Sequence, residues 1–156
     1  MRRDAWVATG LAFATASIGG SLTVLDDWYY ALIQPSWKPP DWLFGPAWTT
    51  LFALMAWSGV LAWRASAAQA IETRQRLLAL WALNAVLNVA WSLLFFKLQR
   101  PDLAVIEVCL LWASIVLLIR HLRPYAPKAA GLLWPYLAWV SFAAALNAAV
   151  VYLNQA

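Results

Sequence analysis

Residues 77–96 read LLALWALNAVLNVAWSLLFF, twenty residues without a charged side chain. A helix of about 20 apolar residues crosses the roughly 30 Å hydrocarbon core of a bilayer. Four further stretches are of this kind, and the predicted spans are residues 5–25, 46–63, 77–96, 103–119 and 129–153. The sequence therefore predicts an all-α integral membrane protein, a single domain built as a bundle of five transmembrane helices.

The composition excludes several other classes of protein. Of the 156 residues, 64% are apolar and only 12% are charged, whereas soluble domains carry about 25% charged residues. One Cys and one His do not suffice for a disulfide framework or a Cys/His zinc site. No metal and no required cofactor is expected, and a soluble globular protein is excluded.

The basic residues lie unevenly on the two sides of the predicted bundle. The side with the N-terminus carries Arg2, Arg3, Arg64, Arg74, Arg76, Arg120, Arg123 and Lys128, and the other side carries Lys38, Lys97 and Arg100. The positive-inside rule places the N-terminus in the cytoplasm and the C-terminus outside. Topology thus explains the net charge of +4 without a nucleic-acid partner. Helical spans favour an inner membrane, because bacterial outer-membrane spans are usually barrels.

The first connection, residues 26–45, is unusually long, since connections commonly have about 4–6 residues. Its three prolines and three tryptophans are Pro35, Pro39, Pro40, Trp28, Trp37 and Trp42. Such a segment is either an aromatic belt at the membrane surface or a lid over a cavity between helices. The prolines stiffen the backbone, and this favours the lid.

Three segments carry a more specific pattern. They are Trp28-Tyr29 with Leu32, Pro35-Ser36-Trp37-x-Pro39-Pro40-x-Trp42-x-Phe44 and Trp48; Leu83-Asn84-x-x-x-Asn88-x-x-Trp91-x-x-x-Phe95-Phe96; and Pro135-Tyr136-Leu137-Ala138-Trp139-x-x-Phe142-Ala143-x-x-Leu146-Asn147. Together they resemble the translocator protein family, whose bacterial members are the tryptophan-rich sensory proteins and whose mammalian member is the peripheral benzodiazepine receptor. Chain length, five spans and the long first loop fit as well, so the resemblance covers essentially the whole chain.

The resemblance implies a membrane receptor or sensor, linked to porphyrin or stress regulation, with a pocket under the first loop. Its ligands would be tetrapyrroles such as protoporphyrin IX, and planar aromatics such as isoquinoline carboxamides and benzodiazepines. The predicted pocket residues are Tyr29, Trp37, Trp42, Trp48, Phe52, Asn84, Asn88, Trp91, Trp139 and Phe142. The resemblance also implies a homodimer surrounded by membrane lipids.

The sequence is also compatible with two other activities. One is a light- and oxygen-dependent breakdown of porphyrin, ascribed to the family, for which Trp48 and Trp139 are the candidate residues. The other is transport of porphyrin or sterol. Against sterol binding, no basic residue follows Tyr152, since only Leu153, Asn154, Gln155 and Ala156 remain.

The polar residues inside the spans have either a structural or a functional role. Asn84 and Asn88 are four apart and share a helix face, so each either lines the pocket or bonds a neighbouring helix. Asn147 lies about a quarter turn away from the Trp139 face and is expected to bond another helix. Glu107, the only acid in a span, must be paired, neutral or near water; a proton-coupled role is the alternative.

Overall fold

The structure is a computed structural model that describes residues 3–154. Its five long helices are α1 Arg3–Leu22, α3 Phe44–Ala65, α4 Ile71–Ser92, α5 Pro101–Leu122 and α7 Trp134–Leu153. Shorter elements are α2 Asp27–Ala31, η1 Asp41–Leu43, η2 Ser66–Ala68, η3 Leu93–Lys97 and α6 Pro127–Gly131. The long helices, with their flanking turns, are long and apolar enough to cross a membrane, which confirms the five-helix prediction.

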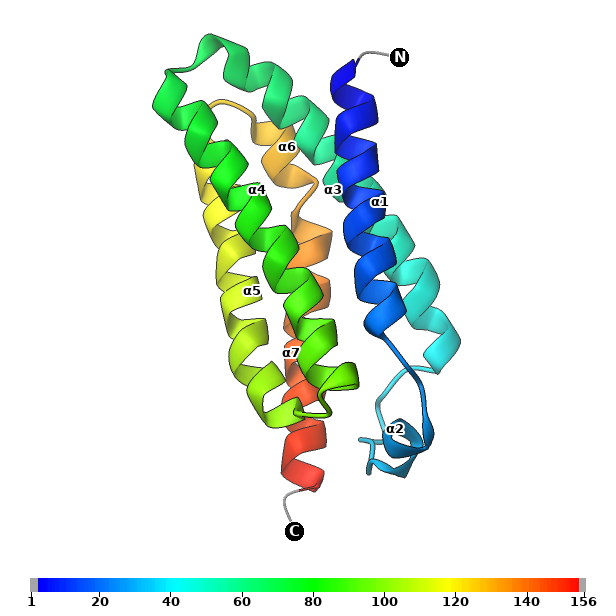
Figure 1. Cartoon of the computed structure of the whole chain (residues 1–156). Helices are drawn as coiled ribbons and strands as arrows, with labels where there is room; N and C mark the ends of the chain where they lie inside the picture. Colours follow the sequence, from blue (N-terminus) through cyan, green and yellow to red (C-terminus); the bar gives the residue numbers. More distant parts are fainter. Residues whose placement is uncertain (1–2, 155–156) are drawn as a thin grey trace.

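The helices pack as a bundle in which α5 lies between α4 and α7, while α1 contacts α3 and α4 (Figure 1). Because two neighbours cover it, α5 supplies much of the core, with Ile115, Leu118 and Leu122 fully buried. Ala62 of α3 and Leu133, just before α7, belong to the same cluster. This packing leaves the outer helix faces for lipid, as expected for a chain that is apolar almost throughout.

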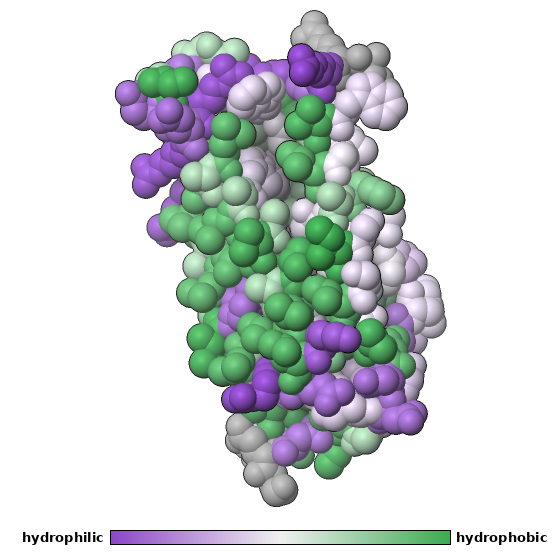
Figure 2. Space-filling view, in the orientation of Figure 1, coloured by the Kyte–Doolittle hydropathy of each residue, from purple (hydrophilic) through white to green (hydrophobic). Residues whose placement is uncertain are grey.

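The two ends of the bundle carry the polar residues. The N-terminus and the turn between α3 and α4 lie at one end, and α2 and the C-terminus lie at the other (Figure 1). Figure 2 shows apolar side chains over the middle of the molecule and hydrophilic ones toward both ends. The chain is a multi-pass integral membrane protein. Arg2, Gln155 and Ala156, used above for orientation and for the sterol motif, lie outside the described residues.

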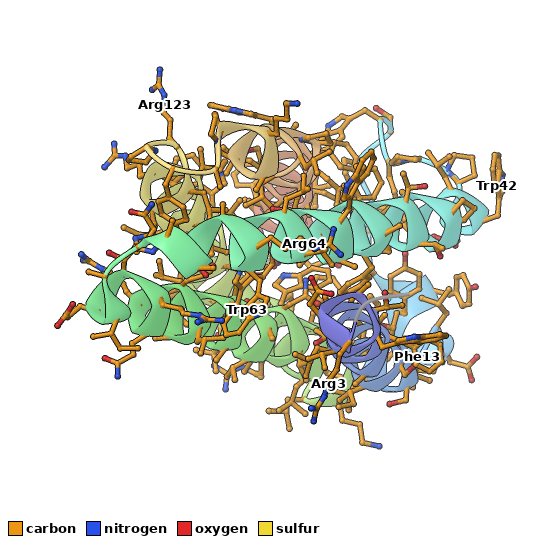
Figure 3. The ribbon with its side chains drawn as sticks, turned by 90° about the horizontal axis from the view of Figure 1, so that it is seen from above. Arg3, Phe13, Trp42, Trp63, Arg64 and Arg123 are labelled. Atoms are coloured by element: carbon orange, nitrogen blue, oxygen red, sulfur yellow. The ribbon has the colours of Figure 1, made fainter. Side chains whose placement is uncertain are left out.

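Helix α1 is the least buried span, with 6% of its hydrophobic window covered. An ion pair between Arg64 Nε and Asp4 Oδ2, 2.5 Å apart, holds its first turn to α3. Near the other end, Gly19 faces α4, where a Cβ would lie in ordinary contact with Ser92 Oγ at 3.7 Å. Phe13, labelled in Figure 3, is an exposed side chain of this helix.

Two expected boundaries differ from the structure. Residues 129–153 do not form one helix, because a turn at Leu132 and Leu133 separates α6 from α7. Pro135 lies in the first turn of α7 and causes no kink there, since the N–H it lacks would have no partner in that position. Helix α4 begins at Ile71, whereas the predicted span begins at residue 77. The prediction counted apolar residues, so it left out the charged first turns of the helix.

The first connection also holds a helix that the sequence reasoning missed. Asp26 caps α2 by accepting a hydrogen bond from Tyr29 N at 3.0 Å. Aspartate is among the preferred N-cap residues, because its side-chain oxygen accepts from an N–H of the first turn.

Candidate functional site

A cavity of about 810 Å³ lies between the five long helices and the first connection. Its aromatic wall consists of Phe13, Tyr29, Phe44, Trp48, Phe52, Trp91, Phe95, Phe96 and Trp139. Small-molecule sites are commonly about 300–1,000 Å³ and mostly apolar, with a few polar groups that orient the ligand. Exposed Phe13 and Thr49 belong to its lining, so the cavity reaches the surface.

Six of the ten predicted pocket residues lie on this wall: Tyr29, Trp48, Phe52, Asn88, Trp91 and Trp139. They come from α2, α3, α4 and α7, far apart in the sequence. The structure therefore brings together most of the predicted set, and Trp48 packs on Phe52 with ring centroids 5.7 Å apart.

Trp37, Trp42 and Phe142 lie off the wall. Trp42 sits in η1, is 72% exposed and projects from the end of α3 in Figure 3. The edge of Trp37 meets Phe142 at 5.9 Å, and Phe142 packs on Trp139 at 5.5 Å. Phe142 thus packs between Trp37 and Trp139, and neither Trp37 nor Phe142 belongs to the cavity lining.

Asn84 also lies off the wall, one turn from Asn88. It is completely buried; its Nδ2 donates to Ser114 Oγ at 2.8 Å, and its Oδ1 accepts from Tyr136 OH at 3.3 Å. Asn84 is thus an interhelical residue. Asn88 fills both roles, because its Nδ2 donates to Tyr136 OH at 3.1 Å while its side chain lines the cavity.

Asn147 lines the cavity, although the helical spacing placed it away from the Trp139 face. Its Oδ1 accepts from Trp91 Nε1 at 3.2 Å and its Nδ2 donates to Pro101 O at 2.9 Å. The expected bond to another helix is present, and it ties α7 to both α4 and α5.

Two N–H donors at the cavity have no hydrogen-bond acceptor among the described residues. They are Trp139 Nε1 and Gln34 Nε2, and both atoms are buried. A buried donor left without a partner destabilises a protein by about 1–3 kcal/mol. Two residues of the cavity lining thus carry a buried donor without a partner.

A charged cluster at the end of the first connection also belongs to the lining, and the sequence reasoning missed it. Lys38 Nζ lies 2.5 Å from Asp41 Oδ1, and Tyr29 OH donates to the same oxygen at 2.9 Å. Burial alone would lower the pKa of Lys38, but the hydrogen bonds to Asp41 and Tyr29 raise it above the usual value. Burial raises the pKa of Tyr29. Lys38 is therefore a charged group that pins Asp41 and Tyr29 together.

Glu107 is 6% exposed and lies off the cavity wall. Neither of its carboxylate oxygens has a hydrogen-bond partner within residues 3–154. The same residues hold no group of three or more His, Cys, Asp or Glu side chains that could bind a metal ion.

Comparisons with known proteins agree with this architecture. The model of the TspO/MBR family matches residues 8–153. The chain is 39% identical to Tryptophan-rich protein TspO of Chlorobaculum tepidum over 93% of this chain and 92% of that one. It is 36% identical to Translocator protein of Ovis aries, over 82% and 75% of the two chains, and 36% identical to Protein CrtK of Rhodobacter capsulatus, over 92% and 89%. The chain belongs to the TspO/MBR family.

Proposed function

We propose that this membrane receptor binds protoporphyrin IX and related planar aromatic molecules, including isoquinoline carboxamides and benzodiazepines, in the cavity between its helices. Membership of the TspO/MBR family supports a sensor or receptor role in the membrane. The observation that carries the choice of ligand is the unpartnered N–H of Trp139 on an aromatic wall.

The chemistry of the wall favours flat ligands with an acceptor group. Trp48, Phe52 and Trp91 bring aromatic rings to the lining, and aromatic pairs gain about 0.5–1.5 kcal/mol beyond area burial. A carbonyl or carboxylate on the ligand would accept from Trp139 Nε1 and Gln34 Nε2. Protoporphyrin combines a large plane with two carboxylates.

The first connection acts in this proposal as a lid. Trp28 packs edge-on against Phe95 of η3 at 6.1 Å, and Phe44 packs against Trp139 at 5.7 Å. These contacts connect the lid to the wall it covers.

The N-terminal end faces the cytoplasm of a bacterial inner membrane, and two chains associate as a homodimer.

Protoporphyrin binding tests the proposal directly. The ligand's own fluorescence is titrated with full-length protein in lipid nanodiscs, for wild type, Trp139→Phe and Trp57→Phe. Trp57 lies on α3 but is 58% exposed and off the wall, so its variant is the matched control. Loss of the indole N–H should weaken binding about fivefold, the value of one hydrogen bond of roughly 1 kcal/mol. Equal affinity in Trp139→Phe and Trp57→Phe would contradict the proposed site.

A second candidate activity, photo-oxidative breakdown of protoporphyrin, is favoured by one observation: Trp48 and Trp139 both line the cavity. Each would hold an oxidisable indole against a photosensitising ring. Illumination in air of protoporphyrin with the protein, or with an equal amount of free tryptophan, tests this. Equal rates of pigment loss in the two samples, or an unchanged rate in the Trp48→Phe/Trp139→Phe variant, would refute catalysis at this site.

A further inference from the structure

A chain of hydrogen bonds leads from the cavity into the core through three helices. Asn88 Nδ2 donates to Tyr136 OH at 3.1 Å, and Tyr136 OH donates to Asn84 Oδ1 at 3.3 Å. Asn84 Nδ2 donates to Ser114 Oγ at 2.8 Å, and Ser114 Oγ donates to the backbone oxygen of Leu111 at 2.7 Å. All four side chains are buried, so water does not compete with these bonds. We name this chain the amide relay.

The carbonyl of Leu111 sets the direction of the amide relay. A carbonyl oxygen only accepts, so the single hydroxyl proton of Ser114 points at Leu111. The Ser114 oxygen must then accept from the NH₂ group of Asn84, which turns Asn84 Oδ1 toward Tyr136. The Tyr136 hydroxyl donates its proton to Asn84 Oδ1, and its oxygen accepts a hydrogen bond from Asn88 Nδ2. The reversed direction would keep three of the four hydrogen bonds, because Ser114 would have to release Leu111.

The direction of the amide relay decides what Asn88 offers to the cavity. One N–H of its NH₂ group donates to Tyr136 OH, which fixes which end of the amide is which, and the carbonyl oxygen Oδ1 at the other end makes no hydrogen bond within the described residues. That oxygen faces α1, since a Cβ at Gly19 would lie 4.0 Å from it. Gly19 and Asn88 both line the cavity. The α4 wall therefore presents an acceptor.

The other polar groups of the wall are either hydrogen-bonded within the protein or left as a donor without a partner. Trp91 Nε1 donates to Asn147 Oδ1, so this indole is not free for a ligand, and one of the two N–H groups of Asn147 Nδ2 donates to Pro101 O. Trp139 Nε1 remains as a donor on α7. Helix α4 thus brings an acceptor, and α7 a donor, to the lining of the same cavity.

We infer that the cavity selects ligands that carry an N–H donor toward Asn88 as well as an acceptor toward Trp139, and that Ser114 sets this preference as a positioning residue. A pyrrole or lactam N–H is a group of the required kind. The inference rests on the proposed function, because it concerns the ligand of the same cavity.

Two tricyclic probes of nearly equal size distinguish binding through a hydrogen-bond donor of the ligand from binding through an acceptor of the ligand. Carbazole carries one ring N–H and no strong acceptor, and fluorenone carries one C=O and no donor. Calorimetry with full-length protein in nanodiscs gives the dissociation constant of each. The readout is the ratio of the fluorenone constant to the carbazole constant, which a general loss of stability does not change.

Ser114→Ala removes the anchor at Leu111 and should lower this ratio about fivefold, the worth of one hydrogen bond. Ser58→Ala is the matched control, because Ser58 is as buried and donates to Ala129 O at 2.8 Å without touching the amide relay. Trp139→Phe should weaken fluorenone alone. If Ser114→Ala does not fold, Tyr136→Phe interrupts the same chain one step nearer the cavity and should lower the ratio likewise.

The ratio staying equal in Ser114→Ala and Ser58→Ala overturns the inference, and so does failure of both probes to bind the wild type. If protoporphyrin does not bind but the probe ratio falls in Ser114→Ala alone, the inference stands and only the proposed ligand is wrong.

Discussion

The side-chain amide of Asn154 engages both backbone polar groups of Ile33. Ile33 N donates to Asn154 Oδ1 at 3.0 Å, and Asn154 Nδ2 donates to Ile33 O at 3.0 Å. The end of α7 and the middle of the first connection are thereby joined, although 121 residues separate them in the chain. This pair is the most direct tie between the proposed lid and the bundle.

Asn154→Ala should speed the release of bound protoporphyrin. Of the three side-chain hydrogen bonds lost, the two to Ile33 hold the first connection and are worth roughly 0.5–1.5 kcal/mol each. The dissociation rate should therefore rise about fivefold or more. Stopped-flow fluorescence with excess unlabelled competitor measures it. Gln99→Ala is the control, because the 3.4 Å contact of Gln99 with Asp26 is long and exposed. A release rate equal to that of the control would show that the pair does not hold the lid.

Asp41→Ala should also loosen the lid, because it leaves the charge of Lys38 buried without its partner; the Lys38 side chain is only 14% exposed. Removing one member of such a pair is worse than removing both. The double variant Lys38→Met/Asp41→Ala should therefore recover part of the loss in ligand retention. No recovery in the double variant would argue against the pairing.

The same cluster predicts a flat pH profile. The pKa of Lys38 is raised, so its contribution is complete below the usual value of 10.5 and is lost only as pH rises through the higher folded-state pKa. Ligand release should therefore not change between about pH 7 and pH 9 in the wild type. A release rate that increases steadily over this window would contradict the assignment.

Asn147→Ala should destabilise the fold by about 1–3 kcal/mol, because it leaves Trp91 Nε1 without its acceptor in a buried site. Thermal or denaturant unfolding of the purified protein measures the change in the free energy of unfolding. Thr50→Ala is the control, because its hydroxyl bonds only Pro46 O of its own helix, on an exposed face. Equal stability of the two variants would show that the three-helix tie contributes little.

The proposed orientation can be tested by cysteine labelling in intact cells. Cys109 is exposed, so the background variant is Cys109→Ser. A membrane-impermeant maleimide added outside should label Ser36→Cys, in the first connection, and should label Ala67→Cys, in η2, only after lysis. The opposite pattern would invert the assignment of the N-terminus.

The five spans could be predicted because length and apolarity find a membrane helix whatever it packs against. The resemblance to the family named Trp48, Asn88 and Trp139, and all three line the cavity. Residue spacing along one helix does not show whether a side chain contacts a neighbouring helix or the cavity. Asn84 and Asn88 share one face, yet Ser114 of α5 lies beside Asn84 and the cavity lies beside Asn88.

Other parts of the site depend on long-range packing. Asn147 appeared off the cavity face because a helical wheel treats α7 by itself, whereas Trp91 and Pro101 come from two other helices. Trp42 carries the motif but sits at the exposed end of α3. Gln34 and Lys38 line the cavity together with residues of the five long helices, and residue spacing within the first connection did not single them out.

The difference between Trp91 and Trp139 has a spectroscopic consequence. The indole N–H of Trp91 is already bonded to Asn147, whereas that of Trp139 has no acceptor among the described residues. In a ¹⁵N-labelled sample, an acceptor-bearing guest should shift the indole resonance of Trp139 downfield and leave that of Trp91 near its place. The protein thus contains an internal probe and an internal reference for occupancy, without any added label.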